Sequence, residues 1–393
     1  LQRPREVHLM YVMPSEKSSI KEMSRFIKQL QFDWKSKNPL LEWQEPMIHF
    51  ESSKPEEVNV FSQIEKTEAV LNQVKANLRE RGLSPSSIAM FATCSLKYYY
   101  SQVLNLRKDK EAEDEMGADV FGTWVHKVLE IVDEEILGQQ QGWYDQANVQ
   151  ERIANLDDYL NKAMLQIQDR EGVYELEKGF NFVLKEVAKT ILEQYYLSEP
   201  SWSEERIKLV AIERKFETRV TVNCQQEEID VKLTGRVDRL DRKGNVYRII
   251  DYKTGKVEKR DLKLTDLGLM DTLTSANFKA KLFQLWFYKF LFTAEMSLPS
   301  SENKELFEGI SKEGIEIQPG IISFRNLAAQ VLHEEKGLWF EEGQSLDAFV
   351  SDSVELIQTW VNRILDTKQT FEKTKDIESC QFCDFKVICH REV

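Results

Sequence analysis

IDVKLTGRVDRLDRKGNVYRIIDYKTGK, residues 229–256, is the stretch that decides the fold of this chain. Two runs typical of β-strands flank Gly244-Asn245, a dipeptide that favours a two-residue hairpin turn. Residues that face each other across such a turn have numbers that sum to 489, like those of the two turn residues. The hairpin therefore places Asp238 opposite Asp251.

Facing carboxylates destabilise a strand pair by about 0.2–1 kcal/mol, so their placement favours a bridging cation. Lys253 follows Asp251 by two residues and points to the same side of the strand. The three charged groups predict a metal site on one patch of the hairpin. The alternatives are an exposed, charged hairpin, or a turn at 243–244 that would pair Asp251 with Arg236.

The composition is that of a globular protein and bounds the classes of function. The chain has 393 residues, enough for two or three domains of about 100–200 residues each, with 41% hydrophobic and 10% aromatic side chains. No apolar run approaches the roughly 18 residues of a membrane span, and no signal peptide is visible. The net charge of −13 argues against a general nucleic-acid binder but leaves room for a local basic channel.

Cysteine usage favours metal binding over disulfides. The five cysteines are unevenly spaced, and an odd number without a secretory signal makes a poor disulfide framework. We therefore expect a reducing cytoplasm and no membrane partner.

The first part of the chain reads as a separate extension. Residues 1–82 are expected to form an N-terminal extension and residues 83–393 one larger domain. A short strand is expected at 6–12 and a polar helix at 19–30, where the run Ser24-Arg25-Phe26 resembles the end of the last motor domain of superfamily 1 helicases. A plain extension is the alternative. The absence of an initiator Met suggests a piece of a longer polypeptide.

Helical and strand patterns alternate through the rest of the chain. A Ser cap followed by Pro at the first helical position marks one helix start, at Ser84-Pro85. Further helices are expected at 65–81, 121–137, across 148–197, and at 278–292 and 346–367. Strands are expected at 207–222, in the hairpin, and at 321–324 after a Pro319-Gly320 turn.

Two of these helices carry polar residues at a spacing of four. Gly122 and His126 share a stripe of the first helix, and Gln284 and Tyr288 share a face of the second. Each of these residues alone is more often an ordinary structural group. Two carboxylates beside a lysine, in contrast, suit hydrolysis of a phosphodiester, because oxygen ligands hold Mg²⁺ or Mn²⁺ and the lysine stabilises developing charge.

Four short motifs occur in an order that resembles the RecB/AddB-type nucleases of the PD-(D/E)XK superfamily. They are GTWVH at 122–126, GRVD at 235–238, DYK at 251–253 and QLWFY at 284–288. The resemblance covers roughly residues 83–393. It implies a restriction-endonuclease-like α/β core, in which a small mixed central sheet is flanked by helices. Val237 stands in place of the family's Pro, which the RecB branch commonly lacks.

The resemblance also assigns roles. His126, Asp238 and Asp251 would bind Mg²⁺ or Mn²⁺ with help from the backbone carbonyl of Tyr252. Asp238, Asp251 and Lys253 would be the catalytic residues. Two further residues would contact DNA or support the site: Gln284 and Tyr288.

The cysteines follow the same branch of the superfamily. Cys94 together with Cys380, Cys383 and Cys389 resembles the iron–sulfur staple of AddB-type and related CRISPR-associated nucleases. Such a [4Fe–4S] cluster would join the first helix of the domain to the C-terminal segment. The alternative is Zn²⁺ bound by the three C-terminal cysteines and His390, with Cys94 in the core.

The function implied is that of a metal-dependent deoxyribonuclease that acts as an exonuclease. It would be part of a helicase–nuclease that processes double-strand breaks for recombination. It would cut single-stranded DNA supplied by the rest of the polypeptide and a partner subunit. One alternative is a non-catalytic DNA-binding module that retains the nuclease fold. Another is a stand-alone nuclease of CRISPR adaptation.

Overall fold

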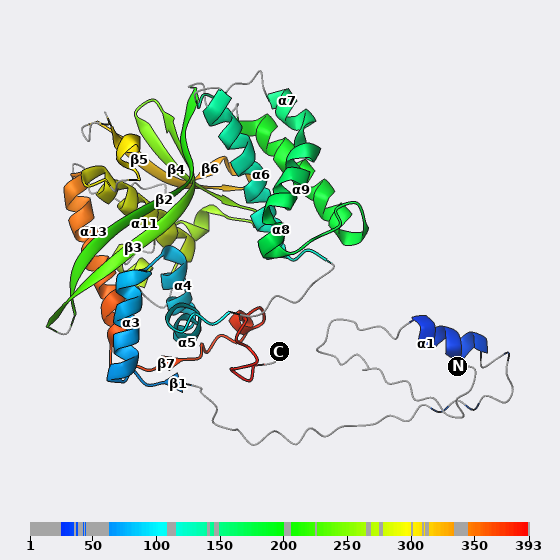
Figure 1. Cartoon of the computed structure of the whole chain (residues 1–393), viewed down its shortest axis with the longest axis horizontal. Helices are drawn as coiled ribbons and strands as arrows, with labels where there is room; N and C mark the ends of the chain where they lie inside the picture. Colours follow the sequence, from blue (N-terminus) through cyan, green and yellow to red (C-terminus); the bar gives the residue numbers. More distant parts are fainter. Residues whose placement is uncertain are drawn as a thin grey trace. The chain divides into compact units, whose positions relative to one another are not determined.

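The chain divides into two units, Leu1–Asn59 and Val60–Val393, and Figure 1 labels α1 (Arg25–Gln29) in the first and the sheet with its helices in the second. The computed structural model describes residues 25–34, 37, 42, 44, 63–107, 115–139, 142–144, 149–199, 206–224, 226–264, 269–274, 278–299, 302–308, 310, 314–333 and 345–391.

The first unit contains one short helical segment among its described residues. Helix α1 (Arg25–Gln29) continues into the π-helical η1 (Leu30–Trp34), and none of their residues is buried. The described part of the helix expected at 19–30 is therefore helical. The strand expected at 6–12 lies outside the described residues.

The second unit is built on a mixed five-stranded sheet in the order β2-β3-β4-β5-β6. Strands β4 and β5 run parallel, whereas the other neighbours are antiparallel. This confirms the expected mixed sheet. The strands are β2 (Ile207–Cys224), β3 (Glu227–Lys243), β4 (Val246–Lys253), β5 (Glu316–Ser323) and β6 (Val331–Leu332).

The central hairpin has the predicted register. Strands β3 and β4 flank the Gly244-Asn245 turn, and their pairs run from Lys243↔Val246 to Arg239↔Ile250, all with numbers that sum to 489. Gly244 has a φ of 58°, a left-handed conformation that glycine adopts without strain. The ladder ends one step before Asp238 and Asp251.

The turn expected at Pro319-Gly320 is wrong, because both residues lie inside β5 and pair with Ile249 and Ile250. The register of β5 with β6 comprises Ile321 and Ile322, so Pro319 lies beyond that ladder, where a missing N–H costs no sheet hydrogen bond. A Cβ atom at Gly320 would lie 2.5 Å from a side-chain atom of Val331. The glycine therefore permits close approach of β6.

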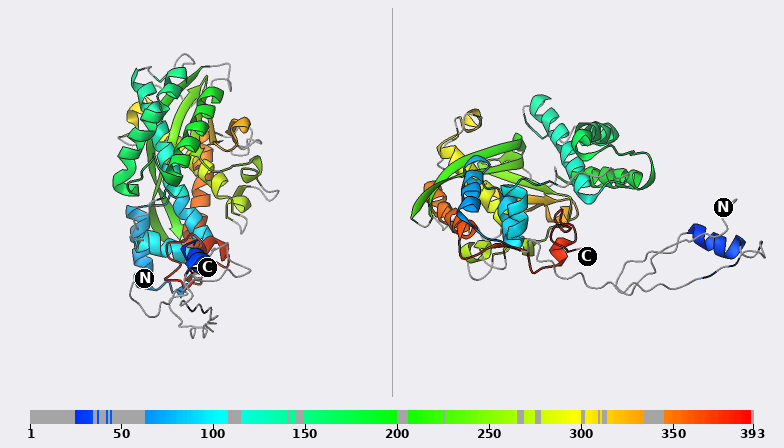
Figure 2. Two further views of the ribbon diagram at one scale, coloured as in Figure 1. Left: turned by 90° about the vertical axis from the view of Figure 1, so that its right-hand side faces the viewer. Right: turned by 60° about the horizontal axis from the view of Figure 1, so that its bottom comes forward.

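Helices cover both faces of the sheet, as the views of Figure 2 show. Ile249 and Ile321 belong to the larger apolar core, which includes residues of α3 (Glu68–Glu80), α4 (Pro85–Thr93), α11 (Ala280–Ser297) and α13 (Leu346–Leu365). Ile250 and Ile322 point to the second core, which is formed with α6 (Ala118–Gln139), α8 (Leu156–Glu171) and α9 (Gly179–Ser198). Alternate residues of each central strand thus enter opposite cores.

The expected helices are confirmed within a few residues. Ser84 caps α4 with Pro85 at its first position, and the region 148–197 resolves into α7 (Val149–Ala154), α8 and α9. The remaining short elements are α5 (Ser95–Tyr98), η2 (Tyr99–Val103), η5 (Lys259–Asp261), α10 (Leu269–Thr274), α12 (Lys304–Phe307), η6 (Leu327–Ala329) and η7 (Glu378–Cys380). Among the described helices, none is long and apolar enough to cross a membrane.

The C-terminal segment returns to the first helices of the second unit. Strands β1 (Gln63–Ile64) and β7 (Phe371–Glu372) form a small antiparallel sheet. The backbone N–H of Glu372 donates to Oγ of Ser95 at 2.9 Å, and the ring of Phe371 stacks on that of Tyr99 with centroids 5.1 Å apart. A hydrogen bond and a ring contact therefore join the segment near Ser95 to the segment near Glu372.

Candidate metal centre

The candidate site lies where the β3–β4 ladder ends. One step beyond the last pair, the backbone N–H of Tyr252 donates to Oδ2 of Asp238 at 2.7 Å. The Tyr252 side chain turns the other way, into the core beneath α6 and α9, where its hydroxyl lies 3.2 Å from that of Tyr195. This places Asp238 beside the backbone of β4 at the residue that follows Asp251.

Helix α6 brings His126 to this carboxylate. Nδ1 of His126 lies 3.5 Å from Oδ2 of Asp238. The helix packs closely here, since a Cβ atom at Gly122, one turn before the histidine, would be 3.4 Å from Oγ1 of Thr254. Burial lowers the pKa of His126, but the hydrogen bond and the negative charge of Asp238 outweigh it and raise that pKa.

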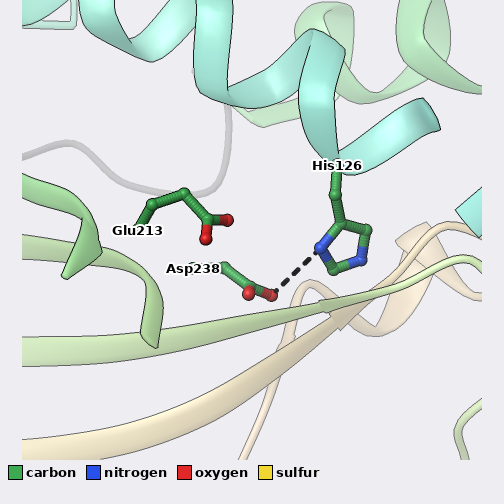
Figure 3. A group of neighbouring side chains, drawn as sticks. All are labelled: His126, Glu213 and Asp238. Atoms are coloured by element: carbon green, nitrogen blue, oxygen red, sulfur yellow. Dashed lines mark ion pairs between the residues drawn. The ribbon is translucent and has the colours of Figure 1, made fainter. Parts of the chain in front are cut away.

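Glu213 completes the group and was not expected from the sequence. Ligand atoms of His126, Glu213 and Asp238 all lie within 4.8 Å of one another (Figure 3). Strand β2 carries a register shift between Leu209 and Ala211, and Glu213 has a φ of 42°, an uncommon conformation for a side chain other than glycine. Such strained residues cluster at functional sites.

The position of Glu213 follows from the long β2–β3 hairpin. The pairs Ile212↔Arg239 and Arg214↔Val237 flank the point at which Glu213 lies opposite Asp238. The last pair of this hairpin is Cys224↔Glu227, and the sequence between them, Gln225-Gln226, is not a strong turn signal. Only knowledge of the β2–β3 register could have placed Glu213 opposite Asp238.

Asp251 belongs to a second set of contacts, with α11. Gln284 donates through Nε2 to Oδ1 of Asp251 at 2.8 Å and to the hydroxyl of Tyr288 at 2.9 Å. Nζ of Lys253 lies 2.7 Å from Oδ2 of Asp251. These predicted residues therefore form one chain of contacts, which runs from Lys253 through Asp251 and Gln284 to Tyr288.

The charge of Asp238 raises the pKa of the two neighbouring carboxyl groups, Asp251 and Glu213. Burial raises the pKa of Asp251 to about 6, with a further contribution from the charge of Asp238, although Lys253 opposes the rise. Burial also raises the pKa of Glu213 to about 7, again helped by Asp238. Three carboxylates brought this close carry unfavourable charge that a divalent cation would neutralise.

The donor set fits a divalent metal ion. His126 supplies an imidazole nitrogen and Glu213 and Asp238 supply carboxylate oxygens. Carboxylate oxygens suit Mg²⁺ and Mn²⁺, whereas an imidazole nitrogen suits transition metals better than Mg²⁺. Asp251 lies outside this group of three but close enough for its charge to act on His126.

Three of the cysteines of the predicted staple, Cys94, Cys380 and Cys383, lie near enough to Cys389 to act on its pKa. Burial raises the pKa of Cys389, and the thiols of Cys94, Cys383 and Cys380 raise it further. The backbone N–H of Lys97 donates to Sγ of Cys94 at 3.4 Å, and Arg391 donates to Sγ of Cys380 at 3.5 Å. His390, the alternative zinc ligand, is exposed.

One of the comparisons with known proteins, that with family models, agrees with this geometry. A solved structure entitled "Crystal structure of SSO0001" is similar over 68% of this chain and 98% of that one, with 14% sequence identity and a TM-score of 0.21. No curated protein matches the chain. The family model of the PD-(D/E)XK nuclease superfamily matches residues 82–390, which include every residue of the candidate site. The chain therefore belongs to the PD-(D/E)XK nuclease superfamily, whose members are generally metal-dependent nucleases.

Proposed function

We propose that this chain hydrolyses phosphodiester bonds of DNA with Mg²⁺ or Mn²⁺ held by His126, Glu213, Asp238 and Asp251. The observation that carries the proposal is the convergence of the first three side chains within 4.8 Å, next to the Asp251–Lys253 pair. A metal ion bound there would neutralise charge on the scissile phosphate and lower the pKa of a bound water.

The residues around the metal position have separate tasks in this proposal. Lys253 keeps its ammonium charge, because Asp251 raises its pKa against the opposing effect of burial. It can therefore orient the attacking water or stabilise charge on the phosphate. Gln284 fixes one oxygen of Asp251, and Tyr288 fixes Gln284. The backbone carbonyl of Tyr252 is proposed as an additional ligand.

The substrate we propose is a single DNA strand, released by a helicase motor during the processing of double-strand breaks. The motor would belong to the rest of the same polypeptide or to a partner subunit. The net charge of −13 supports a domain that receives its strand from a partner, since nonspecific capture of DNA relies on cationic side chains. The free cysteines suit a reducing cytoplasm.

A cleavage assay tests the function. Single-stranded and duplex DNA, labelled at either end, would be incubated with Mn²⁺ or with EDTA. We expect metal-dependent cutting of the single strand, lost on Asp251→Ala substitution. Release of mononucleotides from one labelled end would establish an exonuclease and its polarity, whereas internal fragments would establish an endonuclease. DNA binding without cleavage in Mn²⁺ would overturn the catalytic proposal in favour of a binding module.

We also propose that Cys94, Cys380, Cys383 and Cys389 hold a [4Fe–4S] cluster with a structural role. The nearness of the other three thiols to that of Cys389 and the N–H and guanidinium donors at two of the sulfurs support a shared cluster site. Iron and sulfide analysis of anaerobically purified protein tests this. Four irons per chain, lost on Cys389→Ser, are expected. Zinc in a colourless protein would overturn the cluster.

A further inference from the structure

A basic surface adjoins the candidate site. Most of it belongs to the segment that follows β4 in the chain. Residues 253–263 and 279–281 carry seven lysine or arginine side chains against two carboxylates, a net charge of +5. The whole chain, in contrast, carries −13. The cations besides Lys253 are Lys256, Lys259, Arg260, Lys263, Lys279 and Lys281.

The 254–264 loop that bears most of these charges is held in one conformation. The N–H of Val257 donates to Oγ of Ser323 at 3.1 Å, and the amide of Asn326 donates to the carbonyl of Val257 at 2.9 Å. Val257 and Leu262 are buried in the core. The loop is therefore anchored at two points by its apolar residues while its cations remain outside.

Helix α11 fixes the other end of the loop. Nζ of Lys279 donates to the carbonyls of Arg260 and Lys263 at 2.8 and 2.7 Å. Nζ of Lys281 lies 2.9 Å from Oδ2 of Asp261. Lys279 and Lys281 thus hold the loop against α11, and this places the remaining cations of the loop at defined positions.

The loop lies beside the reacting groups. It begins at Thr254, which approaches Gly122 one turn before His126 in α6. On α11, Lys281 precedes Gln284 by three residues and shares its helix face, and Gln284 bonds Asp251. Lys253 at the end of β4 and Lys281 on α11 therefore lie between the Asp251 carboxylate and the rest of the loop's cations.

The loop's cations are available to a ligand. The side chains of Lys256 and Arg260 are 62% and 83% exposed, and both pair with the single carboxylate of Glu258. Lys263 is also exposed. Exposed ion pairs are worth about 0–1 kcal/mol, so a phosphate group competes with Glu258 at little cost.

We propose that the 254–264 loop and the first turn of α11 bind the backbone phosphates of the DNA strand on one side of the scissile bond. This inference rests on the proposed nuclease function and adds where the strand runs. Lysine and arginine side chains bind backbone phosphates whatever the base sequence. The surface would therefore add affinity for the strand and fix its orientation, without selecting bases.

The test compares two triple variants with the same change of charge. The loop variant is Lys256→Gln, Arg260→Gln and Lys263→Gln. The control variant, on exposed positions of the α8–α9 region, is Lys162→Gln, Arg170→Gln and Lys178→Gln. Binding of a fluorescent single-stranded oligonucleotide would be measured in EDTA by anisotropy over a range of salt concentrations, with thermal unfolding to confirm folding.

Three lost phosphate contacts should reduce the slope of log K against log salt by about 2, at about 0.7 per contact for single strands. The same change raises Kd roughly 100-fold at about 0.1 M salt. The control variant should keep the wild-type slope. An unchanged slope in the loop variant, or an equal loss in the control, would overturn the proposal.

Cleavage in Mn²⁺ separates this proposal from the proposed function. The ratio of kcat/KM on the oligonucleotide to kcat/KM on a nitrophenyl diester of thymidine monophosphate should fall by roughly the same 100-fold in the loop variant, through KM on the strand. If wild-type protein cleaves neither substrate, the catalytic function fails. The binding slopes in EDTA still decide whether the loop contacts the strand.

Discussion

The backbone N–H of Tyr252 donates to Oδ2 of Asp238 over 2.7 Å, at the point where the β3–β4 ladder has stopped. Where the next backbone–backbone hydrogen bond between the strands would be expected, the backbone of β4 instead donates to the side chain of a candidate metal ligand on β3. It keeps the strands together while their side chains separate, Asp238 toward His126 on α6 and Asp251 toward Gln284 on α11. The site therefore lies between the two helices, at an opening made by the sheet itself.

Lys253→Met tests the catalytic lysine. The substitution keeps the aliphatic stem but removes the charge next to Asp251, so kcat for single-stranded DNA should fall about 10²–10³-fold. Initial rates under saturating Mn²⁺ measure this. Lys162→Met, on exposed α8, should retain the wild-type rate. A Lys253→Met rate within about tenfold of wild type would remove the lysine from the mechanism.

Glu213→Gln tests the ligand that sequence patterns did not reveal. Loss of one carboxylate from the group with His126 and Asp238 should weaken Mn²⁺ binding about 10–100-fold. Titration of activity with Mn²⁺ should therefore shift to higher concentrations, with recovery when the metal is in excess. Glu228→Gln, at an exposed position of β3, is the control. Identical titrations for wild type and Glu213→Gln would exclude Glu213 as a ligand.

Gly235→Ala tests the packing that supports Tyr288. A Cβ atom at this glycine would lie 2.9 Å from Cδ1 of Leu291 and 3.0 Å from Cε1 of Tyr288. Overpacking of this kind costs about 1–3 kcal/mol of unfolding free energy, measured by urea denaturation. In Gly138→Ala, within α6, the new Cβ meets nothing within 4 Å, so this variant should gain stability. Equal stability of both variants would contradict the close packing.

The sequence predicted the features that depend on local chemistry. The Gly244-Asn245 turn set the register of the central hairpin, and the four-residue spacing of Gln284 and Tyr288 correctly placed both on one face of a helix. Both signals act over a few residues, so the rest of the chain changes them little. For the same reason the Ser84-Pro85 helix start was recognisable without the structure.

The missed features depend on contacts between distant segments. Glu213 lies opposite Asp238 because of the register of the long β2–β3 hairpin, which no strong turn signal marks, and its own backbone is left-handed. Pro319-Gly320 reads as a turn by composition, but parallel pairing with β4 holds it extended. The two-residue strands β1 and β7 pair across 300 residues of chain and have no pattern of their own.

Lys289 provides a test by pH, away from the candidate site. This residue of α11 is 4% exposed, and burial lowers its pKa from 10.5 to about 7 despite the opposing charge of Glu316. Above about pH 7 the folded protein has released this proton, whereas the unfolded chain keeps it until about pH 10. Because the unfolded state then binds more protons, folding stability rises with pH in that range.

Lys289→Met removes this dependence. The unfolding free energy of wild type minus that of Lys289→Met should be constant below about pH 6 and rise by about 2–3 kcal/mol by about pH 9. Urea denaturation at a series of pH values measures it. Lys162→Met, whose lysine is exposed, should show a constant difference. A constant difference for Lys289→Met as well would mean that the lysine keeps its ordinary pKa in the fold, and that water or a polar partner compensates its burial.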